Sequence, residues 1–227
     1  MRSPHPNLGA ALSQAALWGV PRTVGGLVFW WNATSLRDRS NTGDAAKHLT
    51  MVGAPTRTAV DAGYNNQPTY TFSGGQALVS GTWASPLAQQ CTIYVVGNIP
   101  GAGTYFYTDG IDTTNRVGMA ALTGAISIYA GSFLSSGVSN TSKHVLCATL
   151  NGASSAIYVD AYTSASGSGN AGAKQMNGIT IGNSYNVATT MAGGKVAEVC
   201  AFTGSHTLAQ RTLMAKYLGA KYGIAVS

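Results

Sequence analysis

The chain has 227 residues, of which 9% are charged, 45% are hydrophobic and 29 are glycine. This composition excludes intrinsic disorder caused by high net charge and low hydrophobicity. No stretch approaches the ~20 apolar residues that span a membrane. The net charge of +6 comes from 13 scattered Lys and Arg residues, so we expect no nucleic acid and no membrane among its partners.

Residues 1–26 differ in composition from the rest of the chain. They show no strand-like alternation, a short Ala-rich helix is predicted over residues 8–17, and PRTVGG ends the segment. Pro4 and Pro6 interrupt an apolar run that is too weak for a signal peptide, so we expect a protein made in the cytosol. We predict that residues 1–26 form an arm that docks on a partner. A poorly ordered terminus is the alternative.

Residues 27–227 are expected to form one domain of about a dozen short strands, because apolar runs recur between Gly, Pro and Asn residues at even spacing. The Asn151-Gly152 pair predicts a hairpin, and SASGSGNAG (residues 164–172) predicts a low-complexity surface loop. The clearest predicted strands are 27–31, 56–60, 69–72, 90–98, 104–108, 116–121, 125–129, 144–150, 155–162, 179–182 and 195–202. An apolar run at HLTMVG (residues 48–53) and a turn with a short strand at SGGQALVSG (residues 73–81) are also expected.

The C-terminal strand and helix carry the strongest local signals. Residues 195–202 are apolar on both faces except for Glu198, which indicates a strand covered on two sides. Thr207 and Gln210 have the spacing of a capping box, so a helix is predicted over residues 208–222, ended by Gly223.

One face of the predicted helix is apolar, so the helix needs an apolar surface to pack against. We expect it to cover a sheet edge or one end of a sandwich, and we expect Leu213→Asp or Tyr217→Asp to unfold the domain. The apolar stripe assigned to it consists of Ala209, Leu213, Tyr217 and Ala220.

These elements together predict an all-β fold, an antiparallel β-sandwich of jelly-roll type with a short C-terminal helix. Several segments in chain order support it: FWWNATSL, QPTYTFSGGQALVSG, CTIYVVGN, HVLCATLNGASSAIYVDAY, ITIGNSYNVATTMAGGKVAEVCAF and YLGAKYGI. Over residues 27–224 they resemble the concanavalin A-like lectin/glucanase superfamily, specifically its laminin-G-like branch. The resemblance implies the sandwich fold, and relatives that include glycosidases, sugar-binding modules, adhesion domains and virion proteins.

The three cysteines, Cys91, Cys147 and Cys200, each lie in an apolar strand-like run without metal-ligand spacing. We therefore expect buried thiols, no disulfide and a reducing compartment.

The sequence does not predict a catalytic site. The enzymatic branch that this fold resembles uses a Glu-x-Asp-x-x-Glu strand, and retaining hydrolysis needs two carboxyl groups about 5–5.5 Å apart. Glu198 is the one glutamate, and we expect the closing helix or a neighbouring Lys to satisfy it. We predict no catalytic residue, no metal and no cofactor, although the sequence leaves open whether Asp109, Asp112 and Asn115 bind Ca²⁺.

A sugar-binding site needs aromatic faces for stacking and polar groups for directional hydrogen bonds. The first candidate lies around one loop and consists of Tyr105, Tyr107, Asp109, Asn115 and Arg116. A second candidate is formed by Tyr64, Asn65 and Asn66.

From these features we expect a non-enzymatic structural protein of a bacteriophage virion: a head decoration, fibre or tail component. It would dock on other virion proteins through residues 1–26, form a homo-oligomer and contact host-surface carbohydrate. The absence of a signal peptide and of a disulfide framework, the low charge and the separate arm motivate this hypothesis. The alternatives are a carbohydrate-binding or adhesion module of a bacterial protein, and a degenerate glycoside hydrolase.

Overall fold

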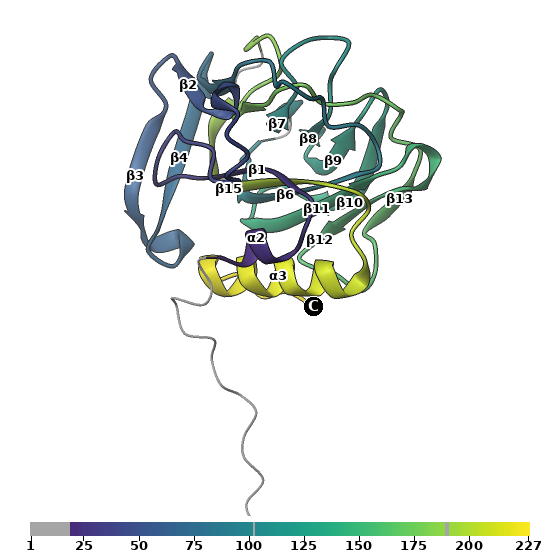
Figure 1. Cartoon of the computed structure of the whole chain (residues 1–227). Coiled ribbons are helices and arrows are strands. Elements are labelled where there is room, and N and C mark those ends of the chain that lie inside the picture. Colours follow the sequence, from purple (N-terminus) through teal and green to yellow (C-terminus); the bar gives the residue numbers. More distant parts are fainter. Residues whose placement is uncertain (1–18, 102, 189–190) are drawn as a thin grey trace, which may run out of the picture.

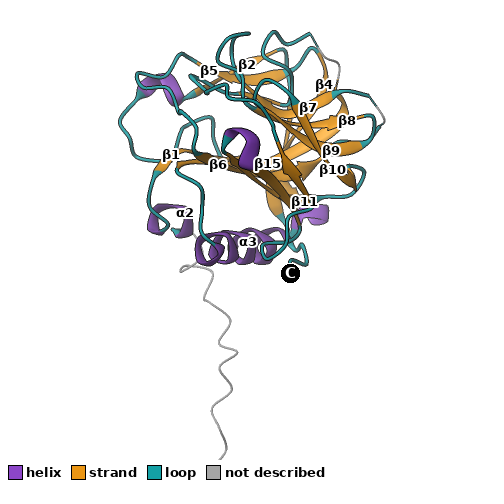
Figure 2. Cartoon of the chain, turned by 90° about the vertical axis from the view of Figure 1, so that its right-hand side faces the viewer, coloured by secondary structure: helices purple, strands orange, loops and turns teal. Residues whose placement is uncertain are grey.

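The computed structural model describes residues 19–101, 103–188 and 191–227, which form two facing antiparallel sheets (Figures 1 and 2). Sheet A has eight strands in the order β13 (Gly167–Gly169), β12 (Ser155–Val159), β11 (His144–Leu150), β6 (Cys91–Asn98), β15 (Met191–Thr203), β4 (Gln67–Gly74) and β3 (Thr56–Asp61), with β1 (Leu27–Asn32) paired to β15. Sheet B has seven strands in the order β10 (Phe133–Ser139), β9 (Ala125–Tyr129), β8 (Gly118–Leu122), β7 (Tyr105–Asp109), β14 (Thr180–Ile181), β5 (Ala77–Ser80) and β2 (Leu49–Val52).

Two α-helices, α2 (Val20–Thr23) and α3 (Leu208–Tyr222), lie together on the side of sheet A that faces away from sheet B (Figure 1). Short 3₁₀ turns occur at η1 (Ala45–Lys47), η2 (Ala62–Tyr64) and η3 (Gly152–Ser154). The predicted β-sandwich with a short C-terminal helix is confirmed. None of the helices in the described part of the chain is long and apolar enough to cross a membrane.

The hairpin predicted around Asn151-Gly152 is present, because β11 pairs antiparallel with β12 across η3. Two strands are missing from the sequence prediction. Residues 167–169 of the predicted low-complexity loop form β13, which pairs with β12 although its sequence is Gly-Ser-Gly. Strand β10 pairs with β9 and has a polar, largely exposed sequence that gives no alternating hydrophobic signal.

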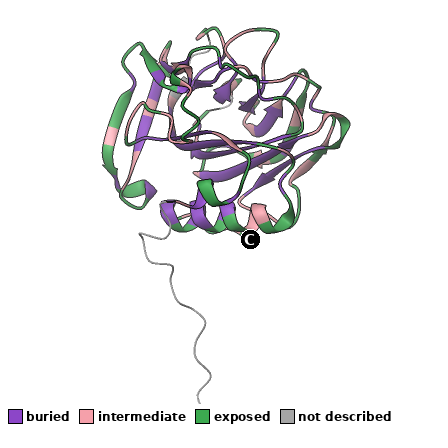
Figure 3. Cartoon of the chain, viewed as in Figure 1, coloured by how far each residue is buried: buried purple, intermediate pink, exposed green. Residues whose placement is uncertain are grey.

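Sheet A is buried on both faces. Along β6, Ile93 and Val95 face the core between the sheets, whereas Tyr94 and Val96 face a second core beneath α3. The same alternation holds on β15, where Val199 faces the first core and Cys200 the second. This two-sided burial explains the continuous apolar sequences of the central strands. The edge strand β3, by contrast, is exposed along most of its length (Figure 3).

Glu198 is 1% exposed and accepts hydrogen bonds from four side chains of the second core. Its Oε1 accepts from Trp30 Nε1 (2.6 Å) and Tyr217 Oη (2.9 Å), and its Oε2 from Lys221 Nζ (2.6 Å) and Tyr222 Oη (2.7 Å). The predicted role of Glu198 as a polar group satisfied by the closing helix and a Lys is confirmed. This network joins β1, β15 and α3.

Helix α3 has the predicted bounds, the capping box of Thr207 and Gln210, and the left-handed stop at Gly223 (φ 64°). The predicted apolar stripe is wrong except at Tyr217, because Leu213 is 41% exposed. The observed buried side chains are Met214, Ala215, Tyr217, Leu218, Lys221 and Tyr222. They recur at intervals of three and four and pack on a sheet face, not on an edge or an end of the sandwich as expected.

The folded unit begins before residue 27. Val20 and Val24 are buried in the second core, and Arg22 donates hydrogen bonds to the Arg39 carbonyl. The last part of the predicted 1–26 arm therefore belongs to the domain, because its two valines cover the apolar surface beside α3. The predicted helix over residues 8–17 lies outside the described residues.

The prediction of buried, unpaired thiols is confirmed for Cys91, Cys147 and Cys200. Burial raises the pKa of Cys91 and of Cys147 to about 12, so these thiols are poor nucleophiles.

Two substitutions on α3 separate the observed buried face from the predicted one. Leu218 is 1% exposed, so Leu218→Asp should cost more than ~3 kcal/mol of unfolding free energy and abolish the folded signal in circular dichroism. Leu213→Asp should remain folded, with a change of less than ~1 kcal/mol, because this side chain is half exposed. An unfolded Leu213→Asp protein with a folded Leu218→Asp protein would contradict the observed orientation of the helix.

The stability of the fold should depend on pH through His206, which is 4% exposed at the start of α3. Burial lowers the pKa of His206 to about 4, whereas 6.5 is its ordinary value. The unfolded chain thus binds a proton in this interval that the folded protein does not. The unfolding free energy should fall by up to ~3 kcal/mol as pH drops from about 6.5 to about 4, and this contribution should change no further below about 4.

Urea denaturation of the protein and of His206→Asn at several pH values between about 7 and 4 measures this effect. Asn keeps an acceptor for the Tyr94 hydroxyl, which lies 2.8 Å from His206 Nδ1. The variant should lose the extra pH dependence. Identical pH dependence in the two proteins would mean that His206 does not titrate in this range.

Candidate functional site

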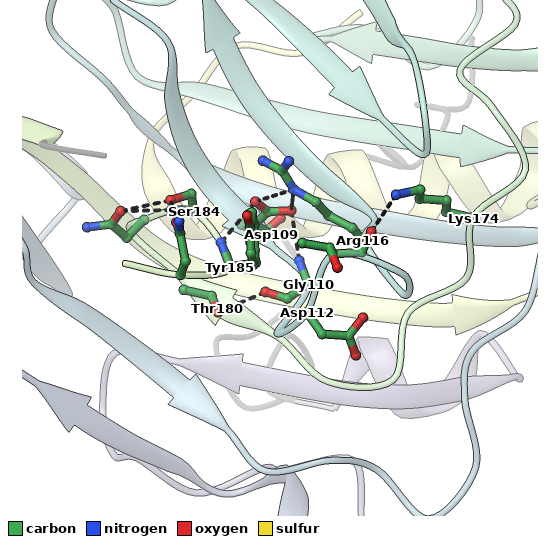
Figure 4. Close-up of polar contacts among 12 residues, drawn as sticks. Asp109, Gly110, Asp112, Arg116, Lys174, Thr180, Ser184 and Tyr185 are labelled. Carbon is green, nitrogen blue, oxygen red and sulfur yellow. Dashed lines mark hydrogen bonds and ion pairs between the residues drawn. The ribbon is translucent and has the colours of Figure 1, made fainter. Parts of the chain in front are cut away.

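Asp109 and Arg116 form a largely buried ion pair where β7 connects to β8 in sheet B (Figure 4). Arg116 Nε donates to Asp109 Oδ1 (3.0 Å) and Oδ2 (2.8 Å), and Asp109 is fully buried. Gly118 allows β8 to approach β7 closely next to this pair, because a Cβ there would lie 2.4 Å from the Thr108 carbonyl oxygen. Burial raises the pKa of Asp109, and the Arg116 guanidinium and two backbone N–H groups oppose that shift.

Asp109 also fixes a distant loop. Its Oδ2 accepts a hydrogen bond from the backbone N–H of Tyr185 (3.0 Å), which lies in the loop between β14 and β15, and its Oδ1 accepts from the N–H of Gly110 (2.9 Å). One buried carboxylate thus positions both the Arg116 guanidinium and the loop that carries Tyr185 (Figure 4).

Three aromatic rings surround the Arg116 guanidinium. Its Cζ lies 4.9 Å from the centroid of Phe106, 4.8 Å from that of Tyr129 and 4.6 Å from that of Tyr185. Phe133 extends the group, since its ring lies 4.9 Å from Tyr129 and is 38% exposed. We call Phe106, Arg116, Tyr129, Phe133 and Tyr185 the arginine–aromatic cluster. Each ring contact is worth about 0.5–2 kcal/mol, so the guanidinium is held in one orientation.

The cluster lies on the outer face of sheet B. Phe106 and Tyr129 alternate along their strands with Tyr107 and Ile128, which face the core between the sheets. Both α-helices lie against sheet A, on the opposite side of the sandwich (Figure 2). The side chain of Arg116 is 19% exposed, and its two Nη atoms point away from Asp109 (Figure 4).

A cleft of about 730 Å³ opens beside the cluster, at the end of the sandwich where loops from both sheets meet. Gln89 ties these loops together, because its Nε2 donates to the carbonyls of Gly172 (3.1 Å) and Lys174 (2.9 Å) and its Oε1 accepts from the N–H of Gly152 (2.6 Å). The volume is within the range of small-ligand sites. The cleft is lined by Ala88, Gln89, Thr114, Asn115, Ala130, Gly131, Asn151, Gly152, Ala173, Lys174 and Gln175.

The structure brings together only part of the first predicted site. Arg116 is its centre and Asp109 its buried support, but the prediction that Tyr107 contacts ligand is wrong, because Tyr107 is fully buried between the sheets. Tyr105 packs against the same core. Side chains alternate along a strand, so the aromatic residue of β7 that faces Arg116 is the intervening Phe106, which is 2% exposed.

Asn115 lies in the cleft wall and is held by its neighbours. Its Oδ1 accepts from Gln175 Nε2 (3.0 Å), and its backbone N–H donates to Asp112 Oδ1 (2.6 Å). The Asp112 carboxylate also accepts from Asn177 Nδ2 (3.0 Å), and these hydrogen bonds lower the pKa of Asp112. Asp112 thus has a structural role in the turn between β7 and β8. Among the described residues, no group of three or more His, Cys, Asp or Glu side chains is arranged to hold a metal ion.

In the second predicted site, Tyr64 belongs to the fold, whereas Asn65 and Asn66 are exposed. Tyr64 is 3% exposed and its hydroxyl donates to Asn98 Oδ1 (2.9 Å). Asn65 Nδ2 donates to the Lys221 carbonyl (3.2 Å) at the end of α3. These residues attach the C-terminal helix to the β3–β4 connection.

Sequence reasoning missed Phe106, Tyr129, Phe133 and Tyr185. Tyr129 and Phe133 are direct partners across the β9–β10 hairpin, a signal that a correct prediction of β10 would have supplied. Tyr185 has no local signal, since the long-range bond to Asp109 places it.

No family model matches the sequence, and no curated protein matches it. Solved structures do match in fold. The sialidase of Trypanosoma rangeli in complex with sialic acid has a TM-score of 0.58 at 15% identity, over 86% of this chain and 33% of the sialidase. Domain 4 of AbnA, a GH43 extracellular arabinanase from Geobacillus stearothermophilus, in complex with arabinotriose, has a TM-score of 0.59 at 10% identity, over 83% of this chain and 98% of that domain.

The binding domain of botulinum neurotoxin DC in complex with SialylT has a TM-score of 0.65 at 9% identity, over 86% of this chain and 52% of that domain. The chain thus spans about a third of the sialidase and about half of the neurotoxin binding domain. At these identities the matches show that the chain shares a β-sandwich fold with domains found in proteins crystallised with sugars.

The buried ion pair predicts a stability difference between two neighbouring aspartates. Asp109→Asn should lower the unfolding free energy by about 2–3 kcal/mol, because it leaves the guanidinium of Arg116 inside its aromatic surroundings without a countercharge. Asp112→Asn, at a partly exposed turn, should cost less than ~1 kcal/mol. Chemical denaturation followed by tryptophan fluorescence measures both values. Equal midpoints for Asp109→Asn and the unchanged protein would exclude the pair as a structural element.

Proposed function

We propose that this domain is a carbohydrate-binding module that carries out no catalysis. The observation that supports it most is the arginine–aromatic cluster. It presents the partly exposed rings of Tyr129, Phe133 and Tyr185 and the donors of Arg116 near a cleft, on a sheet face that the second core does not cover. Sugar sites need such faces for stacking and a few fixed polar groups for orientation. The sugar-bound neighbours of the same fold add an associational argument.

The proposal that the module is not an enzyme rests on its carboxylates. Glycoside hydrolysis uses a pair of carboxyl groups free to act as acid, base or nucleophile. All seven Asp and Glu residues of the sequence lie in the described part of the chain, and each interacts with at least two protein groups. They are Asp38, Asp44, Asp61, Asp109, Asp112, Asp160 and Glu198.

A place for this module in a bacteriophage particle, with a homo-oligomeric assembly and docking through the N-terminal segment, stays a prediction from the sequence. Residues 1–18, which would form most of that arm, lie outside the described residues. In that hypothesis the outer face of sheet B would face host-surface carbohydrate, so the same binding surface serves both settings.

Glycan-array screening followed by calorimetry tests the proposed function. Tyr129→Ala and Phe133→Ala should each weaken binding of the best ligand about tenfold, which corresponds to about 1.4 kcal/mol, because each removes a ring on which a sugar can stack. Val60→Ala is the matched control, since Val60 is 68% exposed on the distant edge strand β3 and should bind as the unchanged protein does.

The result that would contradict the proposal is an array without binding, or binding that is unaffected by both aromatic substitutions. Release of reducing sugar from a panel of polysaccharides would contradict its non-catalytic part.

A further inference from the structure

We propose that the group recognised by Arg116 is a carboxylate on an acidic sugar, of the uronic acid or sialic acid type. This inference rests on the proposed carbohydrate-binding function and specifies its ligand class. It follows from the hydrogen-bonding capacity that the cluster leaves available, from its geometry and from its charge.

The available groups at the centre of the cluster are donors. Arg116 uses Nε for Asp109, and its two Nη atoms have no hydrogen-bond partner among the described residues. The Asp109 carboxylate cannot act as an acceptor for a ligand, because it is fully buried and already accepts from Arg116, Gly110 and Tyr185. A guanidinium edge that offers donors only is best matched by a ligand group that only accepts, and an ionised carboxylate is such a group.

The geometry of the donors matches a planar group with two oxygens. A guanidinium presents parallel N–H bonds in a fixed fork that pairs with a carboxylate in bidentate fashion. Rings of Phe106, Tyr129 and Tyr185 hold the guanidinium at 4.6–4.9 Å, and Asp109 fixes its Nε edge, so the opposite edge is oriented before a ligand arrives. A preorganised fork loses little entropy on binding.

The charge at the cluster favours one carboxylate over a phosphate, which is largely a dianion at neutral pH. Arg116 is the cation within the cluster, and the buried carboxylate of Asp109 balances its charge. The nearest cleft cation, Lys174, donates to the Thr113 carbonyl. Polyanions are usually bound by clusters of several cations, whereas a single charge-assisted fork suffices for a monovalent carboxylate.

The cleft extends the site beyond this one group. Asn115 precedes Arg116 in the chain, and with Asn151 and Gln175 it places side-chain amides along the cleft wall. Amides both donate and accept, as sugar hydroxyl groups do. The carboxylate would thus bind at Arg116 and the neighbouring sugar units in the cleft.

Calorimetric titration of the full chain with matched saccharides tests the inference. The acidic probes are trigalacturonate and 3′-sialyllactose, and the neutral controls are the methyl ester of trigalacturonate and lactose. We expect at least one acidic probe to bind at least tenfold more tightly than its neutral control, and the better of the two identifies the sugar type. A sulfated lactose serves as the control for a tetrahedral oxyanion of the same charge, and it should bind more weakly than that acidic probe.

Arg116→Lys is the matching protein variant, because it keeps the charge but removes the fork. It should weaken the acidic probe at least tenfold and leave any binding of the neutral controls unchanged, and circular dichroism checks its folding. The comparison of the free acid with its methyl ester needs no variant, so it decides the question even if the substitution unfolds the domain.

If both acidic probes bind no more tightly than their neutral controls, or if the sulfated probe binds more tightly than both acidic probes, the carboxylate inference is overturned while the carbohydrate-binding function stands. Absence of binding by every saccharide in this set and in the glycan array would overturn the proposed function as well.

Discussion

The hydrogen-bond network of the buried Glu198 carboxylate is the interaction on which the arrangement of this domain depends. A charge at 1% exposure is unfavourable unless it is paired and fully hydrogen-bonded, and Glu198 meets that condition through Lys221 and the donors of Trp30, Tyr217 and Tyr222. These donors come from β1 and α3, so both elements must lie against β15 for the charge to be satisfied. The network therefore specifies which face of sheet A the C-terminal helix covers.

This placement of α3 also limits which faces of the sandwich stay open. The central strands of sheet A are buried between two cores, so they offer no open face. A second buried carboxylate, Asp109, lies near the outer face of sheet B. Unlike the partners of Glu198, its cation Arg116 keeps two donor atoms directed away from the ion pair. The Glu198 network thus buries one face of sheet A, whereas the Asp109 ion pair leaves donors of Arg116 at the outer face of sheet B. Both are structural residues, although sequence inspection alone could propose either as catalytic.

Local signals in the sequence predicted local structure well. The capping box, the glycine stop of α3 and the Asn151-Gly152 hairpin depend on neighbouring residues, and all are observed. Features that depend on distant contacts were not predictable. The buried face of α3 contains Lys221, a residue that reads as polar until its partner Glu198 is known, and the pattern therefore favoured Leu213 instead. The arginine–aromatic cluster was recognised only at Arg116 and at its buried support Asp109, because strand alternation turns Tyr107 inward and because a long-range bond places Tyr185.

Nuclear magnetic resonance would test most directly whether the outer face of sheet B is the ligand surface. Titration of the isotope-labelled protein with the tightest acidic oligosaccharide should shift the Nε–Hε signal of Arg116 and the ring signals of Tyr129 and Tyr185. Signals of the exposed side of α3, such as the backbone amides of Leu213 and Lys216, should stay in place. Shifts confined to α3 or to the edge strand β3, with an unperturbed Arg116 signal, would contradict the assignment of the binding surface to sheet B.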